Sequence, residues 1–149
     1  MSYKGRYTPK NPQKYRGDTN DIIFRSLWER GTFKWCDTND DILQWSSETI
    51  VIPYHCKTDG KMHRYFVDLW IKFKSGKEVL VEIKPKKQVE QPKAPPSKRI
   101  TRRYLAECLQ YTKNRSKWEA AASYAKDRGW EFNVWTEIQL AKLGITIIK

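Results

Sequence analysis

Apolar positions follow two patterns along this chain, a spacing of three to four residues near its start and alternation farther on. The first pattern covers residues 21–35 and predicts an amphipathic helix, whose N-cap we expect among residues 18–20. Runs of β-branched and aromatic residues predict the strands that follow, at residues 42–45, 49–54, 63–74 and 78–84.

The second half of the chain is predicted to begin with a loop and to continue with two helices and two strands. Pro85 ends the preceding strand, and the proline- and lysine-rich residues 86–100 predict a mobile loop. Thr101 is a suitable N-cap for a long helix to about residue 128, with inward-facing residues that include Leu105, Leu109 and Trp118. The last predicted elements are a strand at 130–136, a short helix at 137–143 and a buried strand at 145–148.

A chain of 149 residues fits one domain, and this order of elements predicts an α/β fold. We assign the domain to residues 19–149 and expect residues 1–18 to form an extended basic arm, because Pro9 and Pro12 prevent a helix there. Tyrosines alternate with cations in the arm. It therefore either lies on nucleic acid or docks on its own domain.

Asp68, Glu82 and Lys84 are the residues that point to chemistry. Alternation puts Glu82 and Lys84 on one face of their strand, together with Leu80, so that face is not simply solvated. A regular two-residue loop at residues 75–76 would turn Asp68 away from Glu82. A three-residue loop or a bulge would place the two carboxylates side by side, and we predict that irregularity.

Two neighbouring carboxylates repel each other unless a cation joins them. Mg²⁺ prefers such oxygen ligands together with water and a substrate phosphate, and it can help to generate hydroxide. A lysine one strand step away can position the attacking water or neutralise charge on phosphorus. The three residues therefore form a plausible set for phosphodiester hydrolysis. The alternative is an exposed ladder of opposite charges across two strands, which is common.

The net charge of +12 is concentrated in two segments, residues 1–16 and 84–103, and the rest of the chain is neutral. Such clusters are expected for phosphate contacts, although solvated, disordered flanks would also be basic. Apart from Lys84, which we assign to chemistry, the cations expected to contact DNA are Lys4, Arg6, Lys10, Lys14, Arg16, Lys86, Lys87, Lys93, Lys98, Arg99, Arg102 and Arg103.

Several classes of protein are disfavoured. No apolar run approaches the roughly 20 residues of a membrane helix, and the first residues lack the apolar core of a secretory signal. Three widely spaced cysteines indicate a reducing cytosol rather than a disulfide framework. The spacing of the cysteines and histidines fits no standard zinc motif. We therefore expect no membrane and no small-molecule cofactor.

The pattern resembles that of the PD-(D/E)XK nucleases. Asp68 matches their first acid and Glu82-Ile83-Lys84 their second element, although Val67 stands where many members have proline. Residues 26–30 (SLWER) resemble the acidic first helix of the superfamily, and their combination with residues 14–17 resembles TnsA-type transposon endonucleases. Residues 1–18, the SLWER helix and HRYFVDLWIKFKSG with VEIKP are similar to the head-completion nucleases of large contractile-tailed phages.

This resemblance implies a restriction-endonuclease-like core and a Mg²⁺-dependent endonuclease, with Mn²⁺ as a possible substitute. It implies that Asp68, Glu82 and the carbonyl of Ile83 bind the metal, that Lys84 activates water, and that Glu29 supports water or a second metal. Gln110 could reach the site or a phosphate, but a solvent or capping contact is the simpler interpretation. Glu48 could be a third acid, although a surface position is the simpler interpretation there too.

The implied role is in virion assembly, on the end of packaged double-stranded DNA, with head, portal or neck proteins as partners. The host cytoplasm, with association to the virion head, is the implied location. A second hypothesis is a DNA-end plug that keeps the nuclease fold without catalysis. RNA is a third possible substrate, but the chain has no RNA-binding signature.

Overall fold

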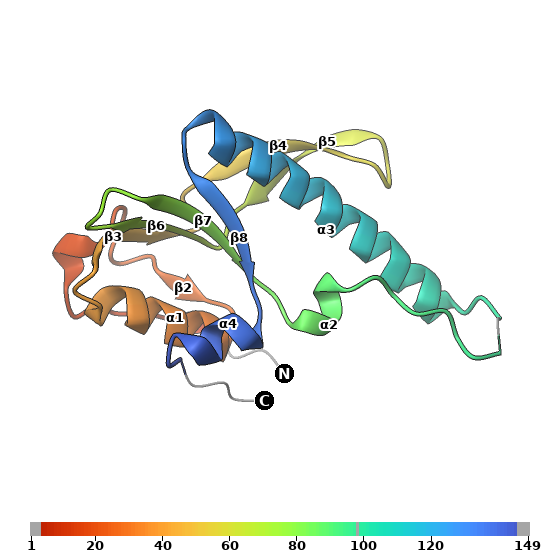
Figure 1. Ribbon diagram of the computed structural model, residues 1–149, viewed down its shortest axis with the longest axis horizontal. Helices are drawn as coiled ribbons and strands as arrows, with labels where there is room; N and C mark the ends of the chain where they lie inside the picture. The colour runs from red at the N-terminus through yellow and green to blue at the C-terminus, as the bar shows by residue number, and fades with distance from the viewer. Residues whose placement is uncertain (1–3, 98, 146–149) are drawn as a thin grey trace.

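A four-stranded mixed sheet forms the centre of the computed structural model, which describes residues 4–97 and 99–145. Its order is β3 (Ile42–Ser47), β6 (Leu69–Phe73), β7 (Glu78–Ile83) and β8 (Glu131–Trp135), with only the β7–β8 pair parallel. The helices α1 (Leu27–Thr38) and α4 (Glu137–Lys142) lie on one face and α3 (Arg102–Asp127) crosses the other (Figure 1). The predicted α/β fold is confirmed, and it takes the form of a mixed sheet flanked by helices.

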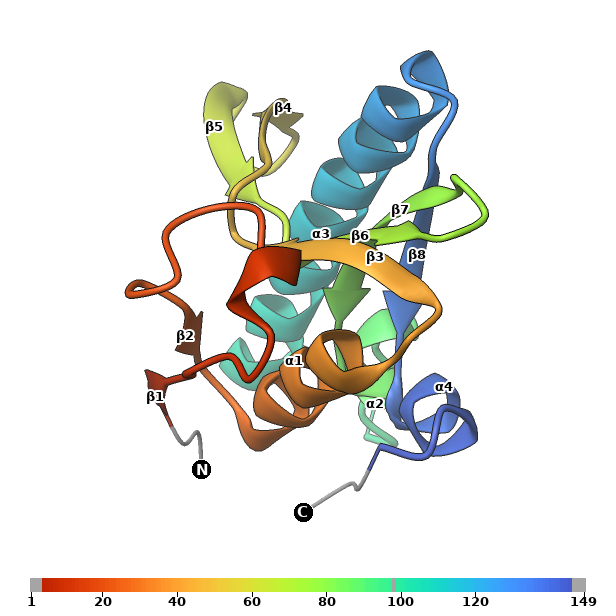
Figure 2. The same ribbon diagram turned by 90° about the vertical axis from the view of Figure 1, so that its left-hand side faces the viewer.

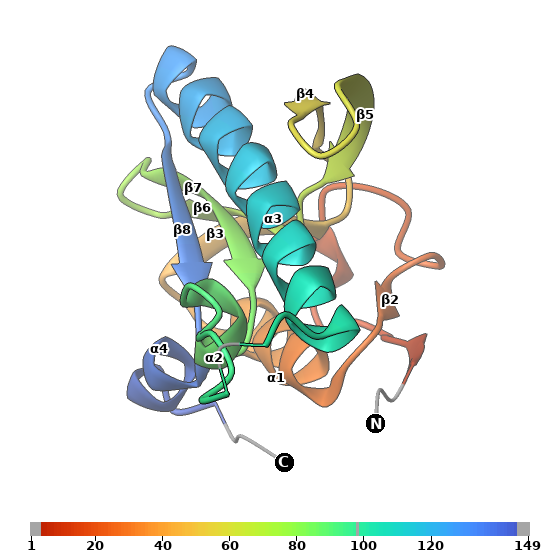
Figure 3. The same cartoon turned by 90° about the vertical axis from the view of Figure 1, so that its right-hand side faces the viewer.

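A separate hairpin of β4 (Val51–Cys56) and β5 (Lys61–Phe66) lies beside α3 (Figure 3). The shorter elements are β1 (Gly5–Arg6), the 3₁₀ turn η1 (Pro12–Lys14), β2 (Ile23–Phe24) and α2 (Lys86–Val89). Among the described helices, none is both long and apolar enough to cross a membrane.

Alternation along β7 divides the core into two clusters. Val79, Val81 and Ile83 pack with residues of α1, β3, β6 and α4. Leu80 is fully buried on the opposite face, among residues of the β4–β5 hairpin and α3. The face that carries Glu82 is therefore covered by α3, as the apolar Leu80 led us to expect.

The first helix begins at Leu27, six residues later than predicted. Ser26 is its N-cap, because its hydroxyl accepts a hydrogen bond from the backbone N–H of Glu29. Ile23 and Phe24, which we assigned to the helix, instead form β2 and pair with β1. The apolar spacing was real, but two of its residues belong to a strand.

The predicted strand over residues 63–74 is in fact two strands, β5 and β6, separated at Val67 and Asp68. β5 pairs with β4 in the hairpin, whereas β6 pairs with β3 and β7 in the central sheet. The sequence stays aromatic and β-branched across the break, so its pattern contains no sign of it. Asp68 consequently sits at the start of a strand and not within one.

The N-terminal arm docks on its own domain, which is one of the two expected alternatives (Figure 2). Asp37 of α1 accepts hydrogen bonds from the Tyr7 hydroxyl at 2.7 Å and from the backbone N–H of Lys10 at 2.7 Å and Asn11 at 2.9 Å. Tyr15 is buried and stacks edge-on against Trp45, with 4.7 Å between ring centroids. The arm is thus part of the core.

In the second half of the chain, the predicted long helix, strand and short helix are confirmed as α3, β8 and α4. The Thr101 hydroxyl caps α3 by accepting from the backbone N–H of Tyr104 at 3.0 Å. The expected loop over residues 86–100 contains the one-turn helix α2. Leu105 and Leu109 are exposed, contrary to expectation, because the first half of α3 extends past the sheet (Figure 1). The predicted last strand lies almost wholly outside the described residues.

Candidate active site beside the central hairpin

The β6–β7 hairpin places Asp68 and Glu82 opposite each other. Leu69 pairs with Val81, so the next position in this register joins Asp68 to Glu82. The turn has three residues, closed by the N–H of Phe73 donating to the carbonyl of Lys77 at 2.9 Å. Gly76 supplies the positive φ of 92° that such a turn requires. The predicted irregularity is confirmed, and of the two expected forms it is the three-residue loop.

The two carboxylates are held in different ways. Asp68 is half-buried, and its Oδ2 accepts a hydrogen bond from the backbone N–H of Ile83 at 2.8 Å. Glu82 is only 6% exposed, and the hydroxyl of Tyr65 donates to its Oε2. The Nζ of Lys84 lies 4.0 Å from Glu82 Oε1. Strand alternation and the hairpin register thus bring these three predicted residues together.

Lys117 of α3 adds a second cation that the sequence prediction did not include. Its Nζ lies 5.5 Å from the ring centroid of Tyr65. Burial lowers the pKa of Lys117, and the positive charges of Lys113 and Lys84 lower it further, whereas Glu82 acts in the opposite direction. Lys113 and Lys117 are four residues apart on one helix, and this unfavourable spacing of like charges was the available signal.

Burial raises the pKa of the Asp68 carboxyl well above its usual range, and the negative charges of Glu82 and Glu29 raise it further. Burial also raises the pKa of Glu82, against the lowering effects of the Tyr65 hydrogen bond and the two nearby lysines. Carboxyls in this state gain from a positively charged ligand. Their oxygens, with the carbonyl of Ile83, suit a hard divalent cation such as Mg²⁺ or Mn²⁺.

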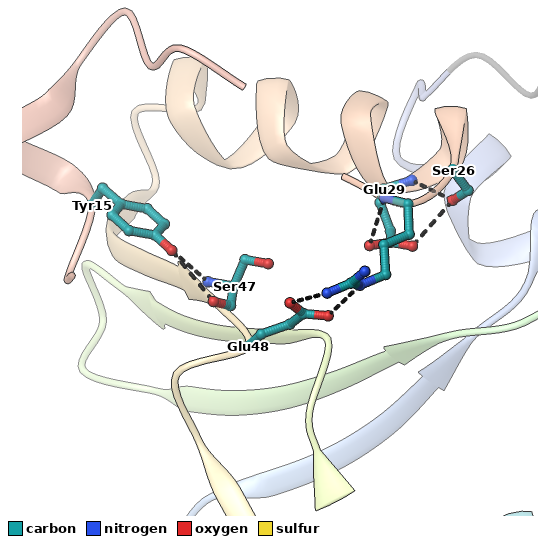
Figure 4. Close-up of polar contacts among 6 residues, drawn as sticks. Tyr15, Ser26, Glu29, Ser47 and Glu48 are labelled. Atoms are coloured by element: carbon teal, nitrogen blue, oxygen red, sulfur yellow. Dashed lines mark hydrogen bonds and ion pairs between the residues drawn. The ribbon is translucent and has the colours of Figure 1, made fainter. Parts of the chain in front are cut away.

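Glu29 occupies the first turn of α1, where its backbone N–H donates to Ser26 and the Ser26 hydroxyl donates to its carboxylate at 3.3 Å (Figure 4). Burial raises the pKa of Glu29, against the hydrogen bonds from Arg25 and Ser26. Because Glu29 in turn raises the pKa of Asp68, its charge acts on the site. The structure therefore places this predicted helix acid within electrostatic reach of Asp68.

Glu48 also lies at the edge of the site. Its N–H donates to the carbonyl of Asp68 at 3.3 Å, and its backbone adopts a positive φ of 56°. Its carboxylate forms an ion pair with Arg25 at 2.9 Å, and Figure 4 shows its side chain directed toward the start of α1. Because Glu48 is half-buried, it does not have the fully exposed surface position that was the simpler interpretation. Because its carboxylate is paired with Arg25, it does not act as a free third acid either.

A groove of about 930 Å³ runs between the arm and α1 and contains four cations, Arg6, Lys10, Arg30 and Lys34. Two of them belong to the predicted DNA-contact set, and the two on α1 were not predicted. Most other predicted cations are exposed, whereas Lys14 is half-buried and its Nζ donates to the carbonyl of Asn39 at 2.7 Å. Lys98 lies outside the described residues.

Gln110 is exposed, and its amide donates to Asn114 Oδ1 at 3.0 Å, not to a site carboxylate. Arg16 lies over the ring of Trp70, 5.1 Å from its centroid. Both residues thus have contacts within the fold.

Two comparisons with known proteins give matches to this chain. Residues 39–137 match the model of the TnsA-like endonuclease N-terminal family, which covers the central sheet and α3. The chain is also 45% identical over 146 residues to a protein of Enterobacteria phage T4 named head completion nuclease, with 97% of each chain covered. On these two matches, the chain belongs to the TnsA-like endonuclease family, with its restriction-endonuclease-like fold, and is a member of the group that contains the phage head completion nuclease.

Proposed function

We propose that this protein is a Mg²⁺-dependent DNA endonuclease that hydrolyses phosphodiester bonds, with Mn²⁺ as a working substitute. The observation that carries the proposal is the placement of Asp68 opposite Glu82 with Lys84 one strand step away. Two carboxylates whose pKa values are raised mainly by burial, beside a lysine, form a site made for a cation and a phosphate.

In this proposal Asp68, Glu82 and the carbonyl of Ile83 hold the metal, which supplies charge stabilisation at the scissile phosphate. Lys84 positions the attacking water and offsets charge that develops on phosphorus. Glu29 orients water from the side of α1. Tyr65 fixes the rotamer of Glu82 through its hydrogen bond, because a buried carboxylate with one oxygen held presents the other in a defined direction.

The exposed cations of the two basic segments grip the DNA backbone. Phosphate contacts of this kind fix register without reading sequence. Arg6 and Lys10 share their groove with two cations of α1, which supports a continuous track for one strand on this side of the molecule. The exposed Lys86, Lys87, Lys93, Arg99, Arg102 and Arg103 would hold DNA on the other side.

Incubation of linear and supercoiled DNA with the full chain tests this proposal. Cleavage is expected with Mg²⁺ or Mn²⁺ and should stop when the metal is chelated. Asp68→Ala and Glu82→Ala should abolish cleavage and leave DNA binding largely intact, because the grip depends on other residues. Undiminished cleavage in chelator, or in both variants, would refute a metal site at these carboxylates.

We further propose that the chain acts in phage head completion, on the end of packaged double-stranded DNA. The support is its similarity to a protein named head completion nuclease over 97% of each chain. This role places it in the host cytoplasm and at the virion head, where head, portal or neck proteins are its partners.

The second candidate function is a DNA-end plug that needs the fold but not the chemistry. The catalytic role and the plug can be distinguished with DNA-filled heads that lack this protein. These heads are mixed with tails and with purified protein. A catalytic role predicts infectious particles with the wild type and few with Glu82→Gln. Equal yields with both proteins would favour the plug.

A further inference from the structure

Cys56, Asp59 and His63 come together at the tip of the β4–β5 hairpin. One donor atom from each lies within 4.8 Å of the other two. Along the sequence, the spacing of the cysteine and the histidine fits no standard zinc motif. The hairpin makes this spacing workable, because the turn after Cys56 carries Asp59 and the returning strand brings back His63.

The three side chains are already arranged as a polar cluster. His63 Nε2 and Asp59 Oδ2 are 2.6 Å apart, and Asp59 Oδ1 accepts from the backbone N–H of Lys61 at 2.9 Å. The thiol of Cys56 is 3.0 Å from the Thr58 hydroxyl.

We propose that this cluster is a Zn²⁺ site with three protein ligands, Cys56 Sγ, Asp59 Oδ2 and His63 Nε2, and a fourth position open to water or a partner. Thiolate and imidazole favour Zn²⁺ over the hard cations expected at Asp68 and Glu82. Donor atoms around a tetrahedral Zn²⁺ are roughly 3.4–3.8 Å apart. The His63 and Asp59 donors, 2.6 Å apart, reach this spacing when they separate by about 1 Å, and the Cys56 donor already lies within 4.8 Å of both.

The fold gives such an ion a structural task. A two-stranded hairpin is marginal by itself, and this one also carries Tyr65, which hydrogen-bonds to Glu82. The Tyr54 ring lies between the two sites, 5.8 Å from the His63 ring centroid and 6.5 Å from that of Tyr65. A metal that ties β4 to β5 at the tip therefore stiffens β5, whose Tyr65 holds the carboxylate of Glu82. Binding displaces the proton of the Cys56 thiol.

Co²⁺ titration of the chelator-stripped full chain tests the site, because a Co²⁺–thiolate bond gives a charge-transfer absorption that oxygen ligands do not. The background carries Asp68→Asn and Glu82→Gln, which removes metal binding at the other site. We expect one equivalent of Co²⁺, displaced by Zn²⁺, and loss of the absorption in Cys56→Ser. His63→Gln and Asp59→Asn should each weaken Zn²⁺ binding about tenfold or more, on the order of the effects of substitutions near metal sites.

Two matched controls accompany these variants. His55→Gln removes the histidine next to Cys56 on the opposite face of β4, and Cys108→Ser removes a cysteine outside the hairpin. Both should bind Zn²⁺ as the parent does. Asp59 is exposed, so Asp59→Asn should fold even if Cys56→Ser does not. Absence of the charge-transfer band, its survival in Cys56→Ser, or unchanged affinity in Asp59→Asn would each overturn the proposal.

Discussion

Asp68 lies among like charges, and this placement has a cost in stability. Its raised pKa means that the folded chain keeps a proton that the unfolded chain has already released. Stability of the metal-free protein therefore falls as pH rises above the ordinary carboxyl value of about 4. Asp68→Asn keeps an acceptor for the N–H of Ile83 and removes the charge.

We expect Asp68→Asn to raise the Tm of the metal-free protein at pH 7 by about 2–4 °C, which corresponds to about 1 kcal/mol in a domain of this size. The gain should largely vanish at about pH 3, below the ordinary carboxyl value, where Asp68 is protonated in both states. Thermal unfolding followed by circular dichroism at the two pH values measures it. A lower Tm at pH 7 would contradict the assigned charge repulsion.

Lys117 offers a second test at this scale, because it lies over Tyr65 and belongs to no sequence motif. Lys117→Met keeps the length of the side chain and removes its charge. We expect single-turnover cleavage to slow by roughly tenfold or more, with partial rescue in Lys117→Arg. Lys126→Met, on the exposed last turn of α3, is the matched control. Equal rates for both Met variants would exclude Lys117 from the site.

At the scale of elements, the arm must stay attached for the domain to fold. Its removal would strip Asp37 of three hydrogen-bond donors and expose the core around Trp45. Deleting the arm is therefore a poor test of DNA binding, because the folding stability of the domain and its affinity for DNA would be lost together. Single substitutions separate the two.

Asp37→Asn should destabilise the protein by about 3 kcal/mol, since a fully buried carboxylate that accepts three hydrogen bonds would become an amide with mismatched donors. Urea unfolding of the full chain measures this. Asp40→Asn changes an exposed neighbour and should stay within about 0.5 kcal/mol of the wild type. A comparable destabilisation in both would show that the buried hydrogen bonds are not the cause.

The elements that the sequence predicted best are those governed by local rules. The α3 helix followed from Thr101 and its long helical stretch. The irregular turn, predicted as a three-residue loop or a bulge, instead followed from the chemical requirement that Asp68 and Glu82 share a face. The break at Val67 and the early β1–β2 pair were missed because both depend on partners distant in sequence. Glu29 was found through resemblance, whereas Tyr65 and Lys117 were assigned to the site only when α3 and β5 were placed beside Glu82.

At the scale of the whole molecule, the excess charge of +12 predicts a salt-dependent grip on DNA. Neutralising Arg6, Lys10 and Lys34, which line one groove, should reduce the slope of log affinity against log salt by up to about 2.7, because each phosphate that the groove no longer neutralises removes about 0.9 from the slope. Neutralising the exposed Lys61, Lys74 and Lys126 makes the same change in net charge elsewhere.

Fluorescence anisotropy with labelled duplex DNA over a range of salt concentrations compares the two triple variants. The control variant should keep nearly the wild-type slope. Equal reductions would mean that the groove contributes only to the net charge, and the predicted track along α1 would then be wrong.

The most direct test of the central claim is cleavage of linear duplex DNA by Lys84→Ala in Mg²⁺, with DNA binding measured on the same preparation. Lys74→Ala, which changes an exposed cation in the β6–β7 turn outside the predicted DNA contacts, is the matched control. We predict that Lys84→Ala binds DNA close to the wild-type level and cleaves about a hundredfold or more slowly, while Lys74→Ala cleaves almost normally. Wild-type cleavage by Lys84→Ala would contradict the catalytic site.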